Sequence, residues 1–188
     1  MITQTPTEIS LSCHPQTPCP GDAALKAAIG WEADGRLKIV YRLSTAVDRL
    51  RIPPRRKVQS LHGLWQHTCF ELFLGAKNDT EYYEFNFSPS GEWAAYEFRN
   101  YRDGGPLGGD DIEPEIVVGE RIEPLELSAA LRWDRLQGIT SKIALAVGLC
   151  AVVEALDGSL SYWALKHPPG KPDFHHADCF ALELIVPG

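Results

Sequence analysis

Two aromatic stretches in the middle of the chain decide its fold class. Residues 64–75 read LWQHTCFELFLG, and residues 81–104 read EYYEFNFSPSGEWAAYEFRNYRDG. In both stretches large apolar side chains alternate with polar ones, which is the pattern of a half-buried β-strand. The turn sequence Ser88-Pro89-Ser90-Gly91 divides the second stretch into two such strands. We therefore expect a sheet of aromatic-rich strands here.

Short strand patterns separated by turn residues continue through most of the chain. The candidate strands cover residues 8–12, 36–44, 48–52, 68–74, 81–88, 92–100, 115–118, 122–127, 142–154, 160–165 and 180–186. So many short strands predict an all-β sandwich or barrel. Two segments depart from this pattern. The Ala and Leu content of residues 22–29 predicts a short helix with Asp22 as its N-cap, and residues 127–136 could form a helical turn.

Composition limits the class of protein further. The chain has 188 residues, of which 44% are apolar, and it contains five Trp, so we expect one domain spanning residues 1–188. The net charge of −7 disfavours nucleic acid as a partner, because binding phosphates requires a positive surface. The start of the chain lacks a signal-peptide pattern, and no apolar run approaches ~18 residues. These features predict a cytoplasmic protein with no membrane partner.

The cysteines give no strong motif. Cys13, Cys19, Cys69, Cys150 and Cys179 are odd in number and contain no C-x-x-C pair, so neither a zinc-finger spacing nor a complete disulfide framework is present. Reduced thiols are the simplest interpretation. Pairing of Cys13 with Cys19 across a Pro-rich loop is the alternative.

Strand alternation sorts the side chains into two faces. In residues 81–88, Tyr83, Phe85 and Phe87 share an apolar face, and the opposite face carries Tyr82, Glu84, Asn86 and Ser88. In residues 68–74, Phe70, Leu72 and Leu74 share one face, whereas Cys69, Glu71 and Phe73 share the other with His67. One face of residues 142–154 carries a row of small side chains, at Ala144, Ala146, Gly148 and Cys150. That row leaves room for either a ligand or a large neighbouring ring.

These motifs resemble those of a known superfamily. The pattern W-x-x-x-x-x-E-L-F-L, the run Y-Y-E-F-N-F-S-P-S-G-E-W and the later Y-W-A-L-K-H-P-P-G-K-P-D-F-H-H at residues 162–176 resemble the DOMON-like superfamily. The similarity is to its bacterial branch, which is related to family 9 carbohydrate-binding modules. It implies an antiparallel, two-layer, jelly-roll-like β-sandwich with at most one or two short helices, and a face that binds sugar or haem. Trp65, Glu71, Asn86 and Trp163 occupy motif positions, and His167, Asp173 and His175 belong to the last motif.

Carbohydrate binding has its own chemical requirements. A pyranose ring needs an aromatic platform and a rim of planar polar groups. The candidate platforms are Trp65, Trp93, Tyr101 and Trp163, and the candidate rim residues are His67, Glu71, Glu84, Asn86 and Arg99. The alternative is that the Trp residues fill the core and that the charged residues form buried networks or surface pairs.

Other functions have weaker support from the sequence. Haem would need two histidines, His67 with His167 or His175, because the only Met is Met1. A divalent metal could bind His167, Asp173 and one further histidine. The glycine-rich run 103–111 predicts a flexible loop, with a calcium site as the alternative. A glycan-processing enzyme would use two of Glu71, Glu84 and Glu97.

The sequence therefore predicts a non-catalytic domain that binds a sugar or sugar derivative, with no required cofactor. A haem or redox module, a protein–protein interaction module and a glycan-processing enzyme remain the alternatives.

Overall fold

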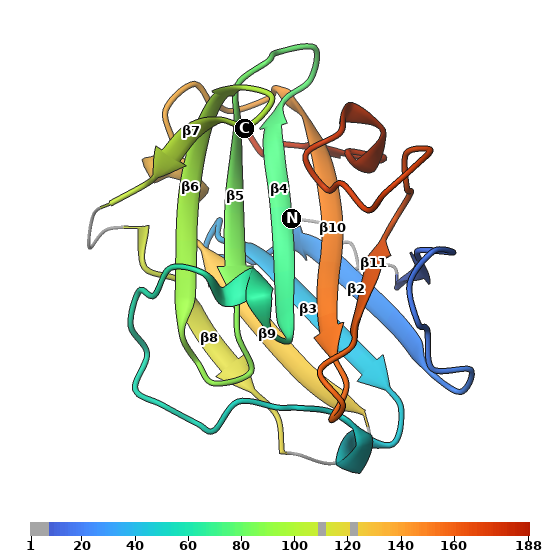
Figure 1. Cartoon of the computed structure of the whole chain (residues 1–188). Helices are drawn as coiled ribbons and strands as arrows, with labels where there is room; N and C mark the ends of the chain where they lie inside the picture. The colour runs from blue at the N-terminus through green and yellow to red at the C-terminus, as the bar shows by residue number, and fades with distance from the viewer. Residues whose placement is uncertain (1–7, 109–111, 121–123) are drawn as a thin grey trace.

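The computed structural model describes residues 8–108, 112–120 and 124–188, which form an antiparallel β-sandwich of two layers (Figure 1). The strands are β1 (Ile9–Cys13), β2 (Ala24–Trp31), β3 (Leu37–Ser44), β4 (Cys69–Ala76), β5 (Tyr82–Phe87), β6 (Trp93–Asn100), β7 (Asp103–Pro106), β8 (Glu115–Val118), β9 (Leu125–Leu131), β10 (Ala144–Glu154), β11 (Leu160–Ala164) and β12 (Leu182–Ile185). The helical elements described are short 3-10 turns: η1 (Val47–Arg49), η2 (Leu64–Gln66), η4 (Trp133–Arg135) and η5 (Ala177–Cys179). The predicted all-β fold class is confirmed.

The two layers are joined along one edge. The front sheet, nearest the viewer in Figure 1, has the order β7-β6-β5-β4-β10-β11, and β12 also pairs with β10. The back sheet has the order β1-β2-β3-β9-β8. Strand β1 pairs with β2 and, at its end, with β11 of the front sheet. The two sheets are therefore continuous where the end of β1 meets β11.

The core lies between the sheets and follows the predicted alternation. Phe70, Leu72 and Leu74 of β4 point into it, as do Tyr83, Phe85 and Phe87 of β5. The opposite faces of the same strands therefore point outward, away from the back sheet. This places Glu71, Phe73 and Glu84 on the outer face of the front sheet.

The predicted helix at residues 22–29 is wrong, because this segment contains strand β2 in the middle of the back sheet. Leu25, Ala27 and Ile29 alternate into the core, and β2 pairs with both β1 and β3. Ala and Leu favour helix only weakly, by a few tenths of a kcal/mol per residue. Pairing on both edges outweighs that preference.

Two other segments also differ from prediction. Residues 48–52 form no strand: η1 is followed by a single bridge between Leu50 and Ala155.

Part of the glycine-rich run forms strand β7 instead of a loop. A Cβ atom at Gly104 would overlap the carbonyl oxygen of Glu97, so glycine permits β7 to approach β6 this closely. The calcium site considered for the run 103–111 stays a prediction, because residues 109–111 lie outside the described residues. Residues 127–136 continue as β9 to Leu131 before the short turn η4, and Ile122 of the expected strand 122–127 is likewise outside the described residues.

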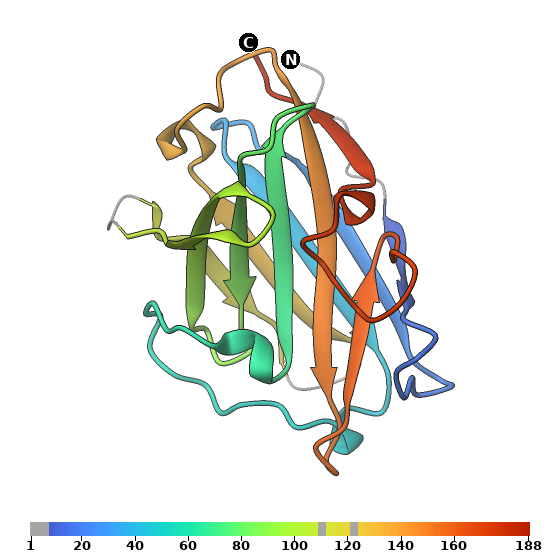
Figure 2. The same cartoon turned by 45° about the horizontal axis from the view of Figure 1, so that its top comes forward.

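The row of small residues on β10 is covered by protein. A Cβ atom at Gly148 would lie 3.1 Å from the carbonyl oxygen of Cys179 and 3.3 Å from Cβ of Phe73. The covering backbone belongs to residues 165–181, which we call the closing segment. In Figure 2 this segment passes in front of β10 and β11. At Gly148 the space is therefore taken by the closing segment and by Phe73, and not by a Trp ring.

The cysteines divide into two groups. Cys13 and Cys19 form a disulfide near the end of β1, whereas Cys69, Cys150 and Cys179 are free and buried. The reduced-thiol interpretation is therefore correct for three cysteines and wrong for this pair. In the described part of the chain, no helix is long and apolar enough to cross a membrane.

Candidate ligand-binding site

A cavity of about 410 Å³ lies on the outer face of the front sheet. Its floor is formed by β4, β5, β6, β10 and β11, and its rim by η2, β7 and the closing segment. In Figure 2 the β6–β7 hairpin lies to the left of β4 and the closing segment lies to its right, in front of β10 and β11. The lining residues are Trp65, Glu71, Phe73, Glu84, Tyr96, Phe98, Arg102, Gly104, Gly105, Pro106, Val152, Tyr162, Pro172, Asp173, Phe174 and His175.

Two carboxyl groups form the polar floor of the cavity. Glu71 on β4 is 3% exposed and Glu84 on β5 is 6% exposed. Burial, followed by the charge of Glu84, raises the pKa of Glu71 well above its ordinary value. Burial also raises the pKa of Glu84 to about 7, although the hydrogen bond from Asn86 and the charge of Arg102 oppose that rise. Near neutral pH the floor therefore holds dissociable protons.

Two buried oxygen atoms at this floor have no hydrogen-bond partner. They are Oε1 of Glu71 and Oδ1 of Asn86, two residues that stand opposite each other in the β4–β5 pair. The amide nitrogen of Asn86 donates to Oε1 of Glu84 at 2.7 Å, so its own oxygen faces away from that bond. Unpaired buried acceptors cost free energy, roughly 1–3 kcal/mol each. A donor group on a bound molecule would recover that loss at Glu71, which lines the cavity.

A histidine from the closing segment completes the floor. Nδ1 of His175 is 2.8 Å from the hydroxyl oxygen of Tyr82, and Nε2 is 3.6 Å from Oε2 of Glu84. Burial, followed by the positive charge of Arg102, lowers the pKa of His175 to about 4. His175 is therefore neutral at pH 7 and supplies no positive charge to Glu84.

Asp173 ties the rim together. Nη2 of Arg102 is 2.8 Å from Oδ1 of Asp173, and the hydroxyl of Tyr101 donates to Oδ2 at 2.7 Å. Arg102 occupies the left-handed region at φ 54°, and its backbone amide donates to the hydroxyl of Tyr82 at 3.1 Å. These contacts join the turn between β6 and β7 to the closing segment across the cavity.

Aromatic rings form the walls. Trp65 on η2 is 42% exposed and meets Tyr96 edge-on at 5.8 Å between ring centroids. Phe98 stacks on Tyr82 at 4.7 Å. Tyr162 and Phe174 contact each other at 5.9 Å on the opposite side. An exposed Trp at the mouth and several rings inside give the cavity apolar surfaces suited to a ring-shaped ligand.

The structure brings together seven of the twelve residues predicted from sequence. Five line the cavity and two are bonded to lining residues: Trp65, Glu71, Glu84, Asp173 and His175 in the first group, Asn86 and Tyr101 in the second. Their roles in binding remain predictions.

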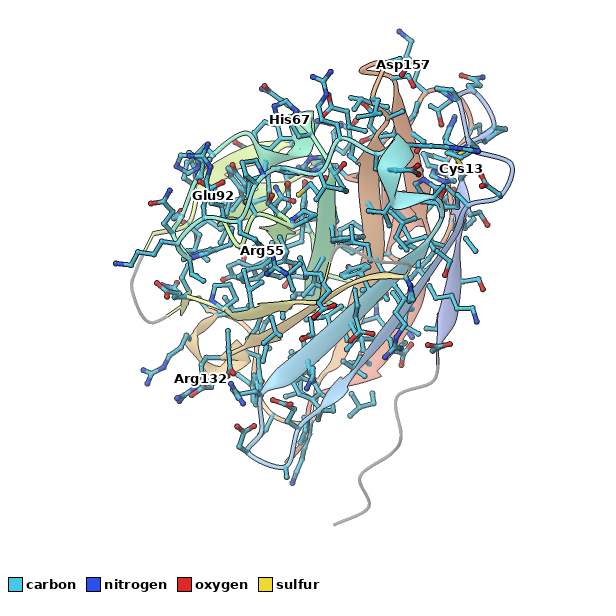
Figure 3. The ribbon with its side chains drawn as sticks, turned by 90° about the horizontal axis from the view of Figure 1, so that it is seen from below. Cys13, Arg55, His67, Glu92, Arg132 and Asp157 are labelled. Atoms are coloured by element: carbon cyan, nitrogen blue, oxygen red, sulfur yellow. A yellow bond between two sulfur atoms is a disulfide. The ribbon has the colours of Figure 1, made fainter. Side chains whose placement is uncertain are left out.

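The other five lie elsewhere. Trp93 and Trp163 are buried in the core between the sheets. Arg99 is a surface residue near Asp103, and Nε2 of His167 bonds the carbonyl oxygen of Ser12. His67 lies at the end of the sandwich seen in Figure 3, with Nδ1 2.8 Å from Oε2 of Glu154. The core-filling alternative thus describes both Trp93 and Trp163.

Several lining residues escaped the sequence analysis. Tyr96 and Phe98 alternate on β6, and their register partners are Glu84 and Tyr82 on the outer face of β5. Extending the alternation from β5 to β6 would have found both. Tyr162 of β11 stands opposite Val152 of β10 in the same way. Arg102 and Phe174 carry no such signal, because their positions depend on how the hairpin and the closing segment fold over the sheet.

The histidines proposed for haem or metal have separate protein contacts. His67 contacts Glu154, His167 contacts Ser12, and His175 contacts Tyr82. Over residues 8–108, 112–120 and 124–188, no group of three or more His, Cys, Asp or Glu side chains is placed to hold a metal ion.

Comparison with solved structures supports the same architecture. A protein from Bacteroides uniformis, described as a "putative carbohydrate-binding protein", superimposes with a TM-score of 0.66 at 15% identity, over 93% of this chain and 84% of its own. The two chains therefore share the same fold. A family 9 carbohydrate-binding module from Caldicellulosiruptor kristjanssonii, in complex with cellotriose, gives a TM-score of 0.51 at 12% identity, over 86% of this chain and 75% of its own. No family model and no curated protein matches the sequence.

Proposed function

We propose that this protein is a non-catalytic, DOMON-like domain that binds a sugar or sugar derivative in the cavity on the front sheet. The observation that carries the proposal is the pairing of aromatic walls with a buried polar floor that includes an unpartnered acceptor on Glu71. The rings would cover the C–H faces of a pyranose, and the floor and rim would bond its hydroxyls. The similarity to a module bound to cellotriose agrees with this ligand class.

The dimensions suit a small ligand. A cavity of about 410 Å³ falls within the range of about 300–1,000 Å³ that is typical of small-molecule sites. Trp65 lies at the mouth of the cavity and is the most exposed of its aromatic wall residues. We expect it to stack on the sugar and to supply much of the contact area.

One observation favours a second candidate, a glycan-processing enzyme. Glu71 and Glu84 line the same cavity and both have raised pKa values, and a carboxyl group with a raised pKa can serve as the general acid of a glycosidase. Incubation with oligosaccharides, followed by chromatography of the products, tests this candidate. If the protein cleaves an oligosaccharide and Glu84→Gln abolishes the cleavage, the enzyme hypothesis replaces the binding proposal.

The binding proposal is tested by isothermal titration calorimetry with neutral and charged mono- and disaccharides. We expect at least one sugar to bind, and Trp65→Ala to weaken that binding by tenfold or more. Trp133→Ala is the matched control, because Trp133 lies in η4 outside this cavity and should leave affinity unchanged. If no sugar binds, or if both substitutions act equally, the proposal is wrong.

A further inference from the structure

We propose that the ligand of this cavity is an amino sugar whose ammonium group lies against Glu71 and Glu84. This inference rests on the proposed function and specifies its ligand class. It follows from the charges and the unpartnered atoms of the cavity floor.

The first argument is the imbalance of charge. The basic side chain that lines the cavity, Arg102, is paired with Asp173 at 2.8 Å. Among the described residues, no Lys or Arg forms an ion pair with Glu71 or Glu84, and the nearest ring nitrogen to Glu84 belongs to the neutral His175. Two buried carboxyl groups thus lack a positive partner. A ligand cation would supply that partner and would allow the two carboxyl groups to ionise in the buried site.

The second argument is the unpartnered acceptor. Oε1 of Glu71 belongs to a side chain that is 3% exposed, lines the cavity and has no hydrogen-bond partner. An ammonium group carries three N–H donors, whereas a sugar hydroxyl carries one. One ammonium group can therefore bond Glu71 and Glu84 together and attract both charges, which a hydroxyl cannot do. Hydrogen bonds between charged groups are also about twice as strong as those between neutral groups.

The walls fit a cation as well. Trp65, Tyr96 and Phe98 present aromatic rings beside the carboxyl floor. The face of an aromatic ring attracts a cation, by roughly 0.5–2 kcal/mol depending on desolvation. An anionic sugar would instead face the carboxyl groups of Glu71, Glu84 and Asp173. Arg102 would not offset them, because it is already paired with Asp173.

Binding of an ammonium group should displace protons from the floor. The titratable groups that face this floor are Cys69 and Glu71 of β4, Tyr82 and Glu84 of β5, Tyr96 of β6, Cys150 of β10, and Arg102, Asp173 and His175 of the rim. The thiols and phenols have raised pKa values and stay neutral near pH 7. Protons released on binding would therefore come from Glu71 and Glu84.

The test is calorimetric titration at pH 7 with three probes: glucosamine, N-acetylglucosamine and glucose, repeated with the galacto series. We expect the free amine to bind at least tenfold more tightly than its acetylated or neutral counterpart. Titrations in two buffers of different ionisation enthalpy should show proton release for the amine alone. In Glu71→Gln and Glu84→Gln the amine preference should fall to threefold or less. Glu97→Gln, an exposed carboxylate outside the cavity lining, should keep the full preference.

Each contrary result has a distinct meaning. If neutral sugars bind as tightly as amines, the inference fails while the proposed function stands. If no sugar of either kind binds, both fail. If Glu71→Gln does not fold, the comparison of probes and the proton release in the unmodified protein still decide the question, and the absence of both would overturn the inference.

Discussion

The hydroxyl of Tyr41 on β3 donates a hydrogen bond of 2.7 Å to the backbone carbonyl of Glu71 on β4, so a side chain of the back sheet holds the floor of the cavity. Tyr41 is completely buried, and its ring stacks on Phe70 at 5.0 Å. This hydrogen bond crosses the core and ends on Glu71, the residue whose Oε1 atom has no hydrogen-bond partner. Core packing and the geometry of the site are therefore linked at Glu71.

Tyr41→Phe should lower the free energy of unfolding by about 1–3 kcal/mol, because it leaves a buried carbonyl short of a donor. It should also weaken sugar binding, because the backbone of Glu71 loses its anchor. Tyr83→Phe is the control: Tyr83 donates to the carbonyl of Gln137 on the far side of the β5 strand. Urea denaturation and titration calorimetry measure the two effects, and equal loss of affinity in both variants would contradict the linkage.

Glu84→Gln should change stability in a pH-dependent manner. The folded pKa of about 7 is raised above the ordinary 4.5, so the folded protein holds a proton that the unfolded chain releases. Its contribution is fully present below pH 4.5 and is lost as the pH rises through 7. Glutamine cannot ionise, so the variant should match the parent near pH 4 and exceed it by up to about 3 kcal/mol above pH 7. Urea denaturation at pH 4, 6 and 8 measures this. Glu97→Gln should show no such trend, and a difference that is constant with pH would refute the assignment.

His175 should produce the opposite slope. Its folded pKa of about 4 lies below the ordinary 6.5, so protonation favours the unfolded chain. Its contribution is complete above pH 6.5 and is lost as the pH falls through 4. His175→Asn should therefore flatten the acid side of the stability profile measured by urea denaturation between pH 4 and 7. An unchanged acid slope would show that other groups cause it.

The tryptophans should divide into binding and core residues. Trp163→Ala should cost about 3–5 kcal/mol of stability, because Trp163 is buried between the sheets and its indole nitrogen donates to Ser161. Trp65→Ala should cost less than about 1 kcal/mol and should instead reduce sugar affinity. Thermal unfolding and calorimetry of the same two samples separate these effects. A large loss of stability in Trp65→Ala would argue against its role as a binding platform.

Reduction of the disulfide should cause a modest, local loss. Cys13 and Cys19 are six residues apart, and closing so short a loop contributes about 2 kcal/mol in the chain-entropy model. Cys13→Ser with Cys19→Ser should therefore lower the melting temperature by several degrees and leave sugar binding unchanged. Labelling the unfolded parent with a thiol reagent should detect Cys69, Cys150 and Cys179, and detection of five thiols would refute the pairing.

Most of the fold followed from local patterns, and the exceptions have physical causes. Alternation placed the core and outer faces of β4 and β5 correctly, because a pleated strand must point successive side chains to opposite sides. It failed for β2, where pairing on both edges overrides helix propensity. The sequence also gave the wrong prediction at β7. Its glycines predict a flexible loop, whereas Gly104 allows β7 to lie close to β6.

The fold class, the inward faces of the central strands and the outward position of Glu71 and Glu84 follow from local sequence patterns, because these features depend on the period of a strand. The packing of the folded chain assigns Trp65 to the cavity, and Trp93 and Trp163 to the core. It alone showed that Arg102, Phe174 and His175 close over the sheet, and that the Glu71 oxygen lacks a partner. Such contacts join residues far apart in the chain, and no local period encodes which distant segments will meet.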